Sequence, residues 1–99
     1  MVVTKLRSNG KITIKLDGKL SVTTSSQLQE ILSDIFPETN NVEVDLRSLT
    51  YISSAGLRAL LVCHKTAEKT GCLMTLSNVS ASMQDIFDAT GFTEHLLFI

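Results

Sequence analysis

The feature that most constrains the fold is that segments with the hydrophobic period of a strand alternate along the chain with segments that have the period of a helix. Residues 11–18, 41–46 and 72–76 alternate apolar and polar side chains, which is typical of strands with one buried face. Residues 2–7 and 96–98 are predicted to form two further short strands. The chain is therefore expected to contain four or five strands.

Three segments between these strands have apolar residues at the spacing of one helix face. The positions are Leu28, Ile31, Leu32 and Ile35, then Leu57, Leu60, Leu61 and Ala67, then Met83, Ile86, Phe87 and Thr90. Thr24 with Gln27 predicts a capping box at the start of the first helix, and Pro37 predicts its end. Gly71 and Gly91 predict where the second and third helices end.

The order of elements is β-β-α-β-α-β-α, which predicts parallel pairing with right-handed crossovers. Strands buried on both faces are almost continuously apolar, whereas these strands alternate. We therefore predict one α/β domain over residues 1–99, with a mixed, mostly parallel sheet and about three helices packed mainly on one face. The short chain and the covered sheet favour a monomer.

Charge and composition exclude several classes of function. Nine basic and ten acidic residues give a net charge of −1, which lacks the basic footprint of a nucleic-acid-binding protein. No apolar run approaches the roughly 20 residues of a membrane-spanning helix, and the first residues lack the order of a signal peptide. Cys63 and Cys72 do not form a disulfide framework, so we expect a reducing, cytoplasmic location.

A polar hinge, Ser53-Ser54-Ala55-Gly56, lies between the predicted third strand and the second helix. The loops at 17–23, 47–53 and 77–80 should be neighbours, because the carboxyl ends of parallel strands share one edge where ligands usually bind. Ser53 or Ser54 can cap the helix. The helix N-terminus also suits a phosphate, and Gly56 permits a close approach of another backbone or of an incoming group. The residues alone leave both interpretations open.

The segment VEVDLRSLTYISSAGLRALL resembles the core motif of STAS domains, specifically of bacterial anti-sigma factor antagonists. The matching positions are Asp45-Leu46, Tyr51-Ile52, Ser53, Ser54, Ala55, Gly56 and Leu57. LDGKLS, with Gly18 and Leu20, resembles a second element of the family, and ATGF resembles its C-terminal element. The likeness runs from about residue 3 to residue 98 in the expected order.

This resemblance implies a phosphorylation site at Ser54 and a partner switch. The unphosphorylated protein would bind an anti-sigma factor, a serine kinase of the histidine-kinase-like ATPase fold, and release a sigma factor for transcription. Phosphorylation would break the complex, and a metal-dependent serine phosphatase would restore it. The partner-binding residues implied in this way are Gly18, Ser21, Thr23, Ser53, Ser54, Gly56, Leu57 and Arg58. Ser53 and Ser21 stand where the family usually has Asp, so two negative charges are missing from this edge.

An alternative function is that of a STAS subunit that is not phosphorylated and docks on the ATPase component of a transporter. The loss of the two Asp residues favours this alternative, since such a partner is not a kinase. The third interpretation is an enzyme, but the sequence contains no motif that predicts catalysis, and we do not expect one. Ser54 does not lie in a G-x-S-x-G motif, no nucleotide-binding glycine loop is present, and no metal site or cofactor is predicted. His64 is expected to be a partly buried, hydrogen-bonded side chain, and Asp45 to stabilise the loop before the helix.

Overall fold

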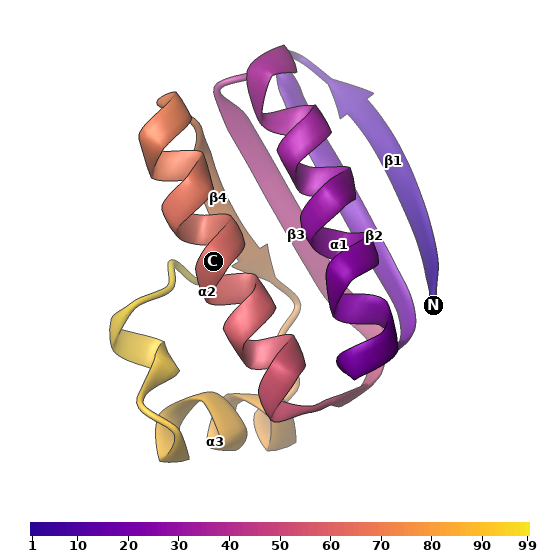
Figure 1. The fold of residues 1–99 in the computed structure, drawn as a ribbon, viewed down its shortest axis with the longest axis vertical. Helices are drawn as coiled ribbons and strands as arrows, with labels where there is room; N and C mark the ends of the chain where they lie inside the picture. The colour runs from indigo at the N-terminus through magenta and orange to yellow at the C-terminus, as the bar shows by residue number, and fades with distance from the viewer.

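A computed structural model describes all 99 residues, and its elements follow the predicted order (Figure 1). The strands and α-helices are β1 (Val2–Ser8), β2 (Lys11–Leu20), α1 (Val22–Ile35), β3 (Asn41–Ile52), α2 (Ser54–Thr70), β4 (Leu73–Ser77) and α3 (Ala81–Ala89). Short 3-10 helices cover Phe36–Glu38 and Phe92–Glu94. No helix has both the length and the apolar composition that are needed to cross a membrane.

The sheet has the strand order β1-β2-β3-β4. β1 pairs with β2 in antiparallel fashion, whereas β2, β3 and β4 are parallel to one another. The predicted last strand reduces to a single parallel bridge between Leu76 and Phe98. The C-terminal segment therefore covers part of the outer edge of β4, while the outer edge of β1 has no neighbouring strand.

Two layers make up the molecule, because α1 and α2 lie side by side on one face of the sheet (Figure 1). The alternating strands direct Ile14 and Val44 into this interface, where they meet Leu28 and Leu60 from the helices, all fully buried. α3 lies at the carboxyl end of the sheet (Figure 1). The prediction that the helices gather mainly on one face is confirmed, with α3 at the end of that layer.

The first helix begins earlier than the capping pattern predicts. Ser21, not Thr24, is the N-cap residue, and α1 starts at Val22. The backbone N–H of Ser21 donates to Thr24 Oγ1 at 2.8 Å, so Thr24 acts as the third helical residue of the capping box. The other predicted ends agree with the structure, since α1 gives way to a 3-10 turn at Pro37 and α2 ends at Gly71.

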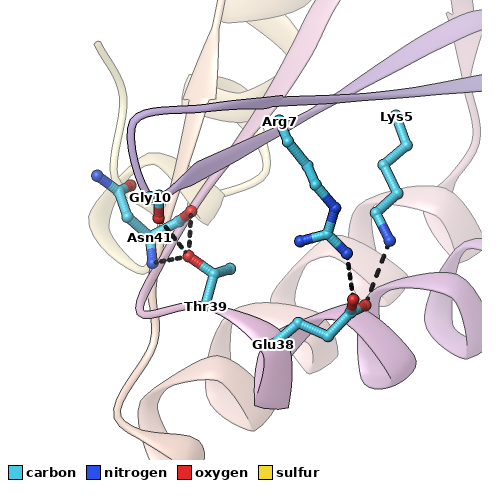
Figure 2. A network of polar contacts seen from close by, with 6 residues as sticks. All are labelled: Lys5, Arg7, Gly10, Glu38, Thr39 and Asn41. Atoms are coloured by element: carbon cyan, nitrogen blue, oxygen red, sulfur yellow. Dashed lines mark hydrogen bonds and ion pairs between the residues drawn. The ribbon is translucent and has the colours of Figure 1, made fainter.

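A polar network fastens β1 to the segment that follows α1 (Figure 2). The Glu38 carboxylate forms ion pairs with Lys5 and Arg7 of β1, and Thr39 Oγ1 donates to the carbonyl of Gly10 at 2.6 Å. The hydrogen bonds from Arg7 and then Lys5 hold the pKa of Glu38 below its ordinary value of 4.5. This network connects β1 and the β1–β2 turn to the segment between α1 and β3, near the amino ends of β2 and β3.

Candidate functional site

The site is built on the carboxyl ends of β2 and β3, which end next to each other. Lys19 pairs with Tyr51 and Leu20 pairs with Ile52, and the Ser53 N–H donates to the Leu20 carbonyl at 2.9 Å. Both α1 and α2 begin at this edge (Figure 1). Segments 17–23 and 47–53 are therefore neighbours, as predicted, although most of both lies in strands and not in loops.

The two adjacent serines have different roles. Ser53 has extended backbone angles, and its Oγ accepts the N–H of Gly56 at 3.1 Å, so Ser53 is the N-cap of α2. Ser54 is the first helical residue and its side chain is exposed. Because Ser53 alone supplies the cap, the Ser54 hydroxyl is available for other chemistry.

Gly56 brings the start of α2 against the end of β2. A Cβ atom at this position would lie 2.7 Å from the Leu20 carbonyl oxygen and 3.0 Å from Ile52 Cγ1, which is too close for either atom. Gly56 and Leu57 are both buried. These two predicted site residues are therefore buried within the hinge, and they position the start of α2 against β2.

The start of α1 contributes further hydroxyl groups. Ser21 Oγ and Thr23 Oγ1 are 3.1 Å apart, and Thr24 Oγ1 donates to the Lys19 carbonyl at 2.8 Å. Thr23 is exposed and Ser21 is half-buried. The two predicted residues Ser21 and Thr23 thus lie together at the mouth of α1.

Gly18 shapes the strand that leads to this edge. Its φ of +114° is a conformation that side-chain-bearing residues rarely adopt. Here the pairing of β2 with β3 shifts register, and Thr50 Oγ1 donates to the Gly18 carbonyl at 3.0 Å. Gly18 is therefore placed as a structural element of the edge, half-buried beside Met1.

The third predicted loop, at 77–80, is tied to the middle of β3 through Asp45. Asp45 Oδ1 accepts the Asn78 amide and the backbone N–H of Arg47, each at 2.9 Å. Burial raises the pKa of Asp45, but these hydrogen bonds and nearby cations outweigh burial, so its pKa lies below the ordinary value of 3.8. Asp45 thus stabilises the chain before the hinge, as expected, and β3 continues seven residues beyond it to Ile52.

The exposed residues of this edge include cationic and apolar side chains and one carboxylate, Asp17. Lys19 and Arg58 are exposed, and neither α1 nor α2 has an acidic residue in its first turn. Val22 and Tyr51 are 71% and 50% exposed, and both belong to this edge. Neither was predicted as a site residue. Val22 could have been predicted as an exposed apolar residue, because it lies off the apolar stripe of its helix.

Polar and nucleophilic groups elsewhere on α2 belong to its packing. His64 Nε2 lies 3.3 Å from Glu68 Oε1, and the side chain is largely buried, as predicted. The predicted hydrogen bond is not found, because Nδ1 of this histidine is buried without a partner. Burial raises the pKa of the Cys63 thiol to about 12, so this sulfur is an inert core group. Arg58, Lys65 and Lys69 are all exposed.

Comparison with known proteins identifies the family. The STAS domain model matches residues 3–99. The chain belongs to the STAS domain family. A Bordetella bronchiseptica protein named as an anti-sigma factor antagonist, BtrV, is 28% identical to this chain over 93 residues. The matched region covers 93% of this chain and 80% of that protein.

Solved STAS structures share the fold over nearly the whole chain. The Bacillus anti-sigma factor antagonist SpoIIAA in its unphosphorylated form matches with a TM-score of 0.76, at 16% identity, over 99% of this chain and 87% of that one. The phosphorylated form of SpoIIAA matches with a TM-score of 0.73, at 17% identity, over 99% and 91%. A sulfate transporter family protein from Wolinella succinogenes matches with a TM-score of 0.80, at 25% identity, over 95% and 80%.

Proposed function

We propose that this STAS domain is an anti-sigma factor antagonist that is switched at Ser54. In its unphosphorylated form it binds an anti-sigma factor that is also a serine kinase of the histidine-kinase-like ATPase fold, and a sigma factor is released. The observation that carries this proposal is the exposed Ser54 hydroxyl at the edge where β2, β3 and two helices meet. The name of the Bordetella relative supports the same role.

The chemistry of the switch is phosphoryl transfer from ATP. The Ser54 Oγ forms a new bond to the γ-phosphorus, the bond to the β-phosphate oxygen breaks, ADP leaves, and the hydroxyl proton passes to a base of the kinase. The phosphoseryl group carries about −1.5 to −2 charges at neutral pH. A metal-dependent serine phosphatase restores the hydroxyl with water and releases phosphate.

The fold accommodates this charge without unfolding. Ser54 is the first residue of α2, where the positive end of the helix dipole favours an anion and the first N–H groups lack intrahelical acceptors. SpoIIAA has the same fold in its phosphorylated and unphosphorylated forms, which supports this view. The new bulk and charge therefore act on the docked partner without unfolding the domain.

The test uses two variants and the purified anti-sigma factor kinase that binds the wild-type chain. We expect Ser54→Ala to bind like the wild type, and Ser54→Asp to bind at least about 100-fold more weakly, because a like charge at an interface costs several kcal/mol. Ser33→Asp, an exposed serine of α1 distant from the edge, makes the same charge change and should bind normally. Equal affinities of the two Ser54 variants in calorimetry would remove the switch.

A second candidate function is docking on the ATPase component of a transporter. It is favoured by Ser21 and Ser53, which stand where kinase-regulated relatives usually carry Asp, and by the likeness to the Wolinella sulfate transporter family protein. In this case a pull-down with Ser54→Asp as the bait would retain as much of the partner as a pull-down with Ser54→Ala. The retained protein would be a nucleotide-binding transporter subunit when identified by mass spectrometry.

A further inference from the structure

We propose that Arg58 is the intramolecular partner of the phosphoryl group on Ser54. Phosphorylation then also makes this guanidinium unavailable to a partner at the docking edge, which is the carboxyl end of β2 and β3 with the starts of α1 and α2. The inference rests on the proposed function, because it assigns a role within the phosphorylated state. It follows from the positions of two exposed side chains on α2, from the lack of an acidic residue in the first turn of this helix, and from the lack of any ion pair to Arg58.

Ser54 and Arg58 are one helical turn apart. Residues at i and i+4 lie on the same face of a helix with Cβ atoms about 5–6 Å apart. Long side chains on a helix lean toward its N-terminus, so the Arg58 side chain extends over the turn that begins with Ser54. A guanidinium presents paired N–H donors that match two phosphate oxygens, which a lysine does not.

Arg58 has no other ionic partner in this structure. None of the four ion pairs involves it, and the first turn of α2 contains no acidic residue. The residues at i−3, i+3 and i+4 from Arg58 are Ala55, Leu61 and Val62, none of which carries a charge. The guanidinium is thus unpaired before phosphorylation and has one predictable acceptor after it.

The consequence is a reversal of charge at the edge. Before phosphorylation, Arg58 and Lys19 are exposed cations at the ends of α2 and β2. Afterwards the phosphoryl group adds an anion and pairs with Arg58, so the partner loses one cationic contact and meets a negative charge. A single modification then changes two groups of the docking edge.

The experiment places phosphoserine at residue 54 during protein synthesis, in the full chain, in the wild-type, Arg58→Ala and Lys65→Ala backgrounds. Lys65 is an exposed cation of the same helix but lies 11 residues from Ser54, about 16 Å along the axis, and serves as the matched control. We expect phosphorylation to raise the melting temperatures of the wild type and of Lys65→Ala by about 4 °C more than it raises the melting temperature of Arg58→Ala.

A second readout reports the contact directly. In the phosphorylated wild type the Arg58 Nε–H resonance should move downfield in ¹H–¹⁵N spectra, and this peak should be missing from Arg58→Ala. An identical effect of phosphorylation on all three melting temperatures, with an unmoved Arg58 resonance, would overturn the proposal. Because the phosphoserine is installed without a kinase, failure of the kinase to modify Ser54 would refute the proposed function and leave this result unaffected.

Discussion

Replacement of Gly56 by Ala tests the geometry that holds the switch in place. The added Cβ would lie 2.7 Å from the Leu20 carbonyl oxygen and 2.9 Å from Leu20 Cγ. This carbonyl accepts the Ser53 N–H at 2.9 Å, so it cannot retreat without stretching that hydrogen bond. Overpacking of this kind costs about 1–3 kcal/mol and a weakened hydrogen bond about 1 kcal/mol, against a gain in helix propensity of at most about 1 kcal/mol.

The net loss is about 2 kcal/mol, which for a domain of this size lowers the melting temperature by about 8–16 °C. Thermal and urea unfolding followed by circular dichroism measure both quantities. Ser54→Ala changes an exposed residue in the same turn and should remain within about 0.5 kcal/mol of the wild type. If Gly56→Ala were as stable as the wild type, the close approach of α2 to β2 described above would be wrong.

Three further predictions concern other parts of the molecule. Ser53→Ala removes the cap of α2 and should lower the free energy of unfolding by about 1 kcal/mol in urea titrations; an unchanged value would show that the Gly56 N–H does not need this acceptor. The pKa of Glu38 is lowered in the folded state, so its ion pairs should stabilise the protein at pH 7 and lose this effect as the pH falls below 4.5. The wild type should therefore exceed Glu38→Gln in stability only above that range, and a stability difference that persists in acid would contradict this. Cys63 and Cys72 are buried, so both thiols should react with a thiol reagent at neutral pH only after denaturation; rapid labelling of the native protein would contradict the burial of these two side chains.

The sheet and its helices were predictable because each element buries a regular set of residues. β2 and the first half of β3 bury every second side chain, and this alternation is visible in the sequence. The pattern fails in the second half of β3, where the pairing with β2 shifts register between Asp45 and Ser48 and again between Leu49 and Tyr51. A strand with such bulges does not alternate, so these residues resemble a loop in the sequence.

The hinge was predictable as a site, but not the roles within it. Ser53 and Ser54 are equivalent as candidate caps in sequence, and only the extended backbone of Ser53 shows which hydroxyl is used. Thr24 was predicted as a cap because Gln27 follows it at the spacing of a capping box. The hydrogen bond from Thr24 to the Lys19 carbonyl, which lies outside the helix, places Thr24 in the first turn and leaves the cap to Ser21.

The central claim is that a phosphoryl group on Ser54 controls partner binding. The most direct measurement compares the chain carrying phosphoserine at residue 54 with the unmodified chain, by isothermal titration calorimetry against the purified anti-sigma factor kinase that binds the unmodified chain. The account predicts tight binding of the unmodified chain and an affinity at least about 100-fold lower for the phosphorylated one. Affinities that agree within about twofold would contradict it, whatever the kinase does to Ser54 in the cell.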